Sequence, residues 1–121
     1  TGKYNQGIPE GSRLSDPSMT WLQLDTDLKP ENIEKVKKLQ EVAGDLGGTL
    51  PQLAIAWLLR LPEMSSVIIG GTKLWQVEDN LKAVEMRKKL TPDVLDRIEE
   101  ILDNNPVKVL HTDVYEKPSF D

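Results

Sequence analysis

Residues 65–73 have the sequence SSVIIGGTK, and residues 74–80 continue it as LWQVEDN. The consecutive apolar residues predict a strand over residues 66–69 that is buried on both faces. Gly70 and Gly71 let the backbone turn sharply, and a helix is expected from Leu74 to Val84. A helix N-terminus that follows a strand in this way can hold a phosphate, so a nucleotide is the expected ligand. The same turn is also typical of a plain connection that binds nothing.

The residues around this turn carry the groups that an anionic ligand needs. Thr72 can cap the helix through its hydroxyl, and Lys73 adds a full positive charge to the partial charge of the helix N-terminus. Gln76, Asp79 and Asn80 lie three to four residues apart, so on a helix they share the face of its first turn. We therefore expect these three side chains to be able to hydrogen-bond a base or a ribose.

Composition bounds the class of protein. The chain has 121 residues, 38% hydrophobic and 29% charged, which predicts one soluble globular domain. It contains no apolar run of 18 residues and no leader pattern, so we expect a cytoplasmic protein without membrane insertion. The net charge of −5 is mixed along the sequence, which argues against nucleic-acid binding. With no cysteine and one histidine, His111, no metal site is expected.

The N-terminal half is predicted to change from loop to helix near Pro30. The first 29 residues are rich in Gly, Pro, Ser and Asp, and we expect them to form a long loop without regular structure. Pro30 suits a first helical position and introduces a helix over residues 31–46. Its apolar residues recur at helical spacing, which predicts one buried stripe. The stripe consists of Ile33, Val36, Leu39, Val42, Ala43 and Leu46.

Two further helices have clear start signals. Thr49 and Gln52 have the spacing of a capping box and begin a helix that is predicted to reach about Arg60. Its body is apolar on nearly every side, so it needs cover on most of them. A last helix is predicted to begin at Thr91-Pro92 and to stop at residues 104–106. Its inner face is expected to hold Leu95, Ile98, Ile101 and Leu102.

The predicted strand has no partner in this sequence. A strand needs a neighbour to satisfy its backbone N–H and C=O groups, yet residues 66–69 are the only convincing strand. The chain also opens at Thr1 inside what reads as a loop already under way. Both observations are explained by the C-terminal part of a larger α/β protein whose other strands lie upstream. The alternative is a complete small helical domain with one strand-like connector.

Four stretches occur together in a further pattern, namely residues 1–13, the run TLPQLAIAWLLR at 49–60, SSVIIG at 65–70, and Gln76 with Asn80-Leu81. Together they resemble the C-terminal third of an aldo-keto reductase, most closely the branch of the voltage-gated potassium channel β subunits and their bacterial relatives. The resemblance covers residues 1–106. It implies an α/β fold, the (β/α)8 TIM barrel, of which this chain would supply about strand 8 with helices 7 and 8 and remain incomplete.

The resemblance also implies a division of the chain, whose residues 1–121 would be the C-terminal segment of a single barrel domain. Residues 1–29 would be a loop on the cofactor side, residues 30–106 the helices and the last barrel strand, and residues 107–121 a C-terminal loop.

Members of the resembled family bind NADPH at the C-terminal ends of the barrel strands and reduce aldehydes or ketones by hydride transfer. The implied cofactor-binding residues are Lys3, Arg13, Gly70, Gly71, Thr72, Gln76, Asp79 and Asn80. Lys3 and Arg13 would meet the cofactor's phosphates. The turn at 70–72 with Gln76 would hold the adenosine end with its 2′-phosphate, and Asp79 and Asn80 would contact the adenine. Lys73 stands where the relatives usually have a neutral residue, so its role rests only on its charge at a helix N-terminus.

The family's catalytic Asp, Tyr, Lys and His map to no position of this chain. They lie near the ends of earlier strands, and the tyrosine donates a proton to the carbonyl while hydride arrives from the nicotinamide. We therefore assign no catalytic residue and expect the isolated chain to be inactive. Two hypotheses stay open for the parent protein. One is an NADPH-dependent oxidoreductase for small carbonyl compounds, and the other is a cofactor-binding regulatory subunit with little turnover, partnered by a channel or by copies of itself.

Overall fold

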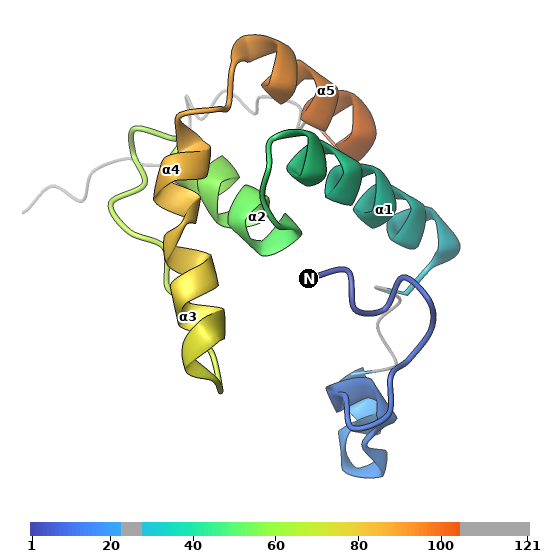
Figure 1. The fold of residues 1–121 in the computed structure, drawn as a ribbon. Helices are drawn as coiled ribbons and strands as arrows, with labels where there is room; N and C mark the ends of the chain where they lie inside the picture. Colours follow the sequence, from blue (N-terminus) through green and yellow to red (C-terminus); the bar gives the residue numbers. More distant parts are fainter. Residues whose placement is uncertain (23–27, 105–121) are drawn as a thin grey trace, which may run out of the picture.

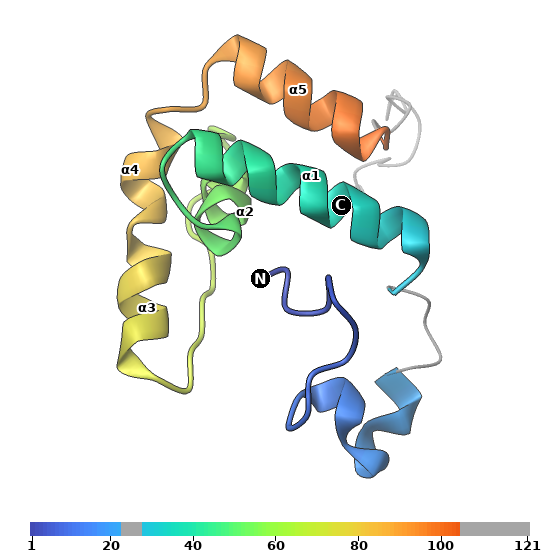
Figure 2. The same ribbon diagram turned by 45° about the vertical axis from the view of Figure 1, so that its right-hand side comes forward.

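The computed structural model describes residues 1–22 and 28–104, and Figure 1 shows its helical architecture. Its elements in chain order are the 3-10 helices η1 (Arg13–Ser15) and η2 (Pro17–Leu22), followed by α1 (Pro30–Asp45), α2 (Leu50–Leu59), α3 (Leu74–Leu81), α4 (Ala83–Arg87) and α5 (Pro92–Leu102). In both views α1 and α5 lie side by side, while α3 and α4 run one after the other along α2 (Figure 1 and Figure 2). The N-terminal segment lies below α1, across the molecule from α3.

The helix predicted over residues 31–46 is confirmed as α1. It buries Val42 and Ala43, near the end of the expected stripe. Gly47 adopts a φ of 72°, and the Gly48 N–H donates to the Ala43 carbonyl at 2.9 Å. Because a left-handed residue is easiest for glycine, Gly47 ends α1 and turns the chain into α2.

The capping box that was predicted for the second helix is present. The Gln52 N–H donates to the Thr49 hydroxyl, and the Thr49 N–H donates to Gln52 Oε1 at 3.3 Å. Helix α2 occupies the centre of the fold, packed against α1, α3 and α4. The core lies around it, and each member is at most 3% exposed: Val42, Ala43, Leu53, Ala56, Ala83, Met86 and Ile98.

Helix α5 is confirmed where it was predicted, and its end is set by Asp103 in the left-handed conformation at φ 44°. Ile98 is the buried residue of its inner face. Arg60, just after α2, ties the two helices together. Its guanidinium lies 3.7 Å from the centre of the Trp57 ring and its Nη2 lies 3.7 Å from Glu99 Oε1 on α5.

The prediction of a strand over residues 66–69 is wrong. This segment has no regular structure, and no strand occurs among residues 1–22 and 28–104. Ile68 is 98% exposed, whereas a strand buried on both faces would cover it. The physical reason is the one that made the segment conspicuous: a strand exists only as part of a ladder, and the described chain supplies no second strand. The structure therefore does not confirm the partial barrel, because the regular elements of its described residues are all helices.

Two smaller predictions also need correction. The N-terminal loop contains η1 and η2, because local hydrogen bonds such as Ser18 N–H to Asp16 Oδ1 at 2.9 Å tighten its turns. The helix predicted over residues 74–84 is broken after Leu81. There the Lys82 N–H donates to the Asp79 carbonyl three residues back at 3.2 Å, which tightens the turn between α3 and α4.

Two predictions fall wholly or partly outside the described residues. They are the C-terminal loop at 107–121, which includes His111, and the stop signal at 104–106, of which only residue 104 is described. Within the described ranges no single helix has the length and apolarity to cross a membrane. Helices α1 and α2 pass that test only as a pair, bent by 86°.

Candidate functional site: the turn that leads into α3

The N-terminal turn of α3 is closed by one glutamine side chain. Gln76 Oε1 accepts hydrogen bonds from the Thr72 N–H at 2.8 Å, the Lys73 N–H at 3.2 Å and the Thr72 hydroxyl at 3.3 Å. The helix begins at Leu74 with Lys73 as its N-cap. The Thr72 hydroxyl therefore donates to Gln76 and does not cap the helix, which corrects the prediction. Gln76 reaches back because a side chain three residues into a helix lies over the first turn.

The two glycines of this turn have different surroundings. A Cβ built on Gly71 would lie 3.0 Å from Gln76 Cβ and 3.2 Å from Val77 Cγ2, so the chain passes close against α3. A Cβ on Gly70 would meet nothing within 4 Å. Gly71 is thus tightly packed inside the turn, while Gly70 borders open space.

The side chains of the other two predicted residues of α3, Asp79 and Asn80, form no hydrogen bond with the turn. Asp79 bonds instead to the start of α2. Asp79 Oδ2 accepts from the Thr49 hydroxyl at 2.8 Å, and Asp79 Oδ1 accepts from Gln52 Nε2 at 2.7 Å. Lys82 Nζ lies 4.0 Å from the same Oδ1. Asn80 is half-buried, and its side chain forms no hydrogen bond with another described residue. The carboxylate of Asp79 therefore faces the start of α2.

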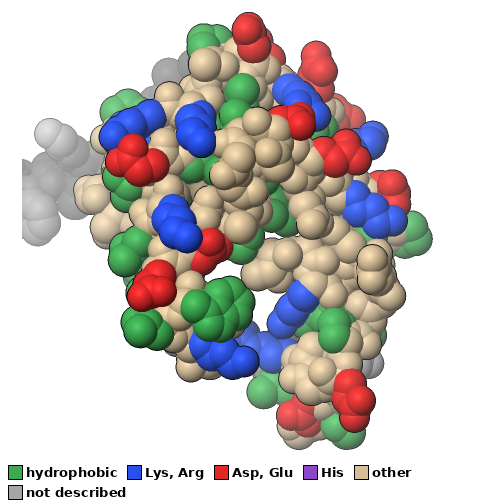
Figure 3. Space-filling model, in the orientation of Figure 1, with side chains coloured by type: hydrophobic (Ala, Val, Ile, Leu, Met, Phe, Trp, Pro, Cys, Tyr) green, Lys and Arg blue, Asp and Glu red, His purple; other side chains and the backbone are tan. Residues whose placement is uncertain are grey.

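The two predicted N-terminal cations lie apart from this turn. Lys3 Nζ is 5.0 Å from the centre of the Tyr4 ring, and Arg13 is an exposed residue of η1. Asn5 fixes this segment to α1, because its Nδ2 donates to Gln40 Oε1 at 2.9 Å. Among the described elements η1 and η2 make no packing contact with α3. Figure 3 shows a hollow between the two regions with Lys and Arg side chains at its rim. The structure thus brings together residues 70–80 but not Lys3 and Arg13.

Sequence reasoning missed the partners of Asp79. Thr49 and Gln52 were read as the cap of their own helix, which they are, but the same two side chains also donate outward to α3. A signal was available, because a capping hydroxyl and a glutamine amide each keep a donor after they have capped a helix.

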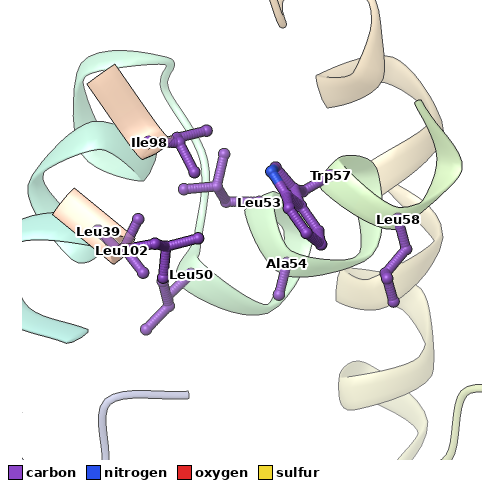
Figure 4. A pocket seen from close by; sticks show the side chains of 8 residues that line it. All are labelled: Leu39, Leu50, Leu53, Ala54, Trp57, Leu58, Ile98 and Leu102. Atoms are coloured by element: carbon purple, nitrogen blue, oxygen red, sulfur yellow. The ribbon is translucent and has the colours of Figure 1, made fainter. Parts of the chain in front are cut away.

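A separate apolar pocket of about 300 Å³ lies on α2. Figure 4 shows Leu39, Leu50 and Leu102 at one end and Trp57 at the other. Almost no polar surface lines it, so it has no group that would orient a polar ligand. Its full lining is Leu39, Leu50, Leu53, Ala54, Trp57, Leu58, Ile98 and Leu102.

Comparison with known sequences agrees with the resemblance. The sequence model of the Aldo/keto reductase family matches residues 1–103. A Schizosaccharomyces pombe protein, provisionally named as a voltage-gated potassium channel subunit beta, is 44% identical over 110 residues, which are 90% of this chain and 32% of the relative. An Arabidopsis thaliana protein with a similarly provisional name is 44% identical over 107 residues, 88% of this chain and 32% of the relative. The chain spans about one third of the length of these relatives. It belongs to the aldo/keto reductase family.

Proposed function

We propose that this chain is the NADP(H)-binding, C-terminal portion of an oxidoreductase that reduces aldehydes or ketones. Family membership supports an oxidoreductase that uses a nicotinamide cofactor. The observation that carries the cofactor assignment is the turn before α3, where Gly70 borders open space and Lys73 places a full charge at the helix N-terminus.

The residues of this turn fit an anionic group such as a phosphate. Lys73 is exposed, so its ammonium can reach a ligand beside the turn. Gln76 uses its Oε1 on the turn itself, while its Nε2 makes no hydrogen bond to any described residue and can donate outward. A cation and an amide donor beside an unobstructed backbone form a suitable donor set for a phosphate. When bound, the nicotinamide cofactor supplies the hydride.

The part of this chain in the reaction is to bind and orient. Lys73 and Gln76 would hold the adenosine end, and Arg13 and Lys3 would reach the phosphates if the N-terminal segment closes toward α3. We assign no proton donor to the chain. The described tyrosine, Tyr4, lies beside Lys3, away from the turn. In this proposal the proton donor belongs to earlier strands of the complete protein.

The proposal includes a barrel that residues 66–69 complete. Val67, Ile68 and Ile69 are consecutive apolar residues, and Ile68 is almost fully exposed in the described structure. Apolar residues of this kind are stabilised when neighbouring strands cover them and pair with their backbone. We propose that these strands come from the remaining two thirds of the family's length.

The decisive experiment measures NADPH and NADH binding to the complete gene product by nucleotide fluorescence. Lys73→Ala should weaken NADPH on the order of tenfold, and NADH less, because a charge-assisted contact contributes about 1.5–3 kcal/mol. Lys82→Ala, at the other end of α3, is the matched control and should leave both affinities unchanged. Equal losses for the two nucleotides would remove Lys73 from the 2′-phosphate.

Gly70→Ala separates ligand approach from folding. The new Cβ meets no protein atom, so the stability of the apoprotein should stay within about 0.5 kcal/mol of the parent. A fall in NADPH affinity would then report a ligand beside Gly70. Arg13→Ala tests whether the N-terminal segment closes over the cofactor, since an unchanged affinity would place Arg13 outside the site.

A second candidate function follows from the names of the two relatives, which describe channel subunits. In this case the cofactor would regulate a partner and turnover would be slow. Loss of NADPH absorbance with a panel of simple aldehydes distinguishes the two. Rapid oxidation favours the reductase, while tight NADPH binding without turnover favours the regulatory subunit.

A further inference from the structure

Asp79 is the predicted cofactor-binding side chain whose hydrogen bonds reach another helix. Both of its carboxylate oxygens accept hydrogen bonds from α2, at 2.8 Å from the Thr49 hydroxyl and 2.7 Å from Gln52 Nε2. Gln52 is itself only 6% exposed. A buried amide that loses its acceptor costs more than an exposed one, so this contact fixes the position of α3 firmly.

We infer that Asp79 is a positioning residue that anchors α3 and its N-terminal turn to the first turn of α2, and that it acts on the cofactor only through this anchor. The inference rests on the proposed function. It assigns Asp79 a different role from the adenine contact that the family resemblance implies.

Helical spacing connects Asp79 to the turn. Asp79 lies three residues after Gln76, so both side chains project from the same side of α3. Fixing the Asp79 carboxylate therefore sets the rotation of α3 about its axis. That rotation decides where Gln76 lies over Thr72 and Lys73, and so how the turn presents its donors.

The charge of Asp79 suits this location. Thr49 is the N-cap of α2 and Gln52 its third residue, so the carboxylate lies at the positive end of the helix dipole. Lys82 stands 4.0 Å away on the outer side, with its own side chain largely exposed. Because Lys82 is largely exposed and lies at the limit of ion-pair distance, it contributes little, and the contacts to the start of α2 dominate.

An exchange of donor and acceptor tests the inference. In the complete gene product, Gln52→Glu keeps the acceptor for the Thr49 N–H but turns a carboxylate toward Asp79. Asp79→Asn leaves an amide opposite the Gln52 amide. Each single variant should weaken NADPH on the order of tenfold, and more than it weakens NADH. The double variant restores a donor facing an acceptor, so NADPH affinity should return to within about threefold of the parent.

Three further variants and a stability measurement separate effects on binding from effects on folding. Thr49→Val removes the hydroxyl at nearly constant shape and should mimic Asp79→Asn, whereas Thr49→Ser keeps the hydroxyl and should bind normally. Lys82→Ala removes the outer cation and should change neither affinity. Thermal midpoints of all variants are recorded without nucleotide.

The inference is overturned if the double variant shows the product of the two single losses, because that result means a direct contact between Asp79 and the nucleotide. It is also overturned if the single variants lower the thermal midpoint but weaken NADPH and NADH equally or not at all. A parent protein that binds neither nucleotide contradicts the proposed function itself, and with it this inference, before any variant is made.

Discussion

The helical core and the segment between α2 and α3 differ in how their apolar side chains are buried and how their backbone hydrogen bonds are made. In the core, α1, α2, α4 and α5 contribute seven residues that are each at most 3% exposed. In the segment, Ile68 is 98% exposed although it lies in the most β-like stretch of the sequence. A helix satisfies its own backbone, whereas a strand depends on another strand. Local sequence therefore suffices for the first region and not for the second.

Truncating one large apolar side chain in each region should give the largest difference in unfolding free energy. Leu53→Ala should destabilise the chain by about 2–5 kcal/mol, because it opens a cavity in the centre of the core. Ile68→Ala should change the unfolding free energy by less than about 0.5 kcal/mol in the 121-residue chain. Urea denaturation of the two variants measures both values, and similar values would mean that the segment is packed.

The unfolding free energies of Leu53→Ala and Ile68→Ala can also be compared in the complete gene product. If upstream strands cover residues 66–69, Ile68→Ala should there cost about as much as a buried aliphatic truncation, roughly 2–5 kcal/mol. A cost that stays near zero would contradict the proposed barrel, while leaving the helical core untouched.

Tight packing around Gly48 is the next largest expected effect. A Cβ on Gly48 would overlap Met86 Cε and approach Gln52 Oε1 at 2.5 Å. Met86 is buried and Gln52 is held by its hydrogen bonds, so neither can move away freely. Gly48→Ala should therefore cost about 1–3 kcal/mol.

Gly44→Ala is the matched control for Gly48. Gly44 lies in the last turn of α1, and a Cβ there meets nothing within 4 Å. Because alanine is the better helix former, this variant should gain up to about 1 kcal/mol. Thermal denaturation should move the two variants in opposite directions, and a common direction would argue against the packing described around Gly48.

The helix caps provide a smaller effect. Thr49 accepts from the Gln52 N–H and also donates to Asp79, whereas Thr91, the N-cap of α5, makes no side-chain cap bond. Thr49→Ala should cost about 1–2 kcal/mol and Thr91→Ala only a few tenths, by urea denaturation. Equal losses would show that the anchor between α2 and α3 contributes nothing.

The predictability of the fold follows the same division between local and distant information. Helices α1, α2 and α5 could be predicted because Pro30, the pair Thr49 and Gln52, and Pro92 mark their starts. The break at Lys82 could not, since periodicity gives a helix without reporting a tightened turn. The strand predicted at 66–69 was wrong because apolar β-branched residues express only a preference for strand, and the described residues supply no second strand to pair with.

The site was predictable to a smaller degree. The start of a helix at Leu74 was correctly expected after the turn at 70–73, whereas Asp79 and Asn80 lie in the last turn of that helix. The attachment of Asp79 to Thr49 and Gln52 spans about thirty residues and depends on how α3 packs against α2. The role of Lys3 and Arg13 likewise depends on a loop whose position relative to α3 no local pattern determines. These cofactor assignments stay predictions.

The smallest expected effect tests whether the N-terminal region is as well formed in solution as the core. The Ser18 hydroxyl and N–H donate to Asp16 at 2.7 and 2.9 Å, and these hydrogen bonds hold the pKa of Asp16 below its usual range. Because the folded pKa is depressed, the associated stability is present above the ordinary aspartate pKa. It is lost as the pH falls through the lower, folded pKa. Ser18→Ala should raise the pKa of Asp16 toward its usual range, as measured by NMR titration of the side-chain carboxyl.

On α1, the Lys37 side chain similarly lowers the pKa of Glu34 through a hydrogen bond and its charge. If Glu34 titrates low while Asp16 titrates normally, the turn that begins η2 is not formed in solution, and the contrast with the helical core extends to the N-terminal segment.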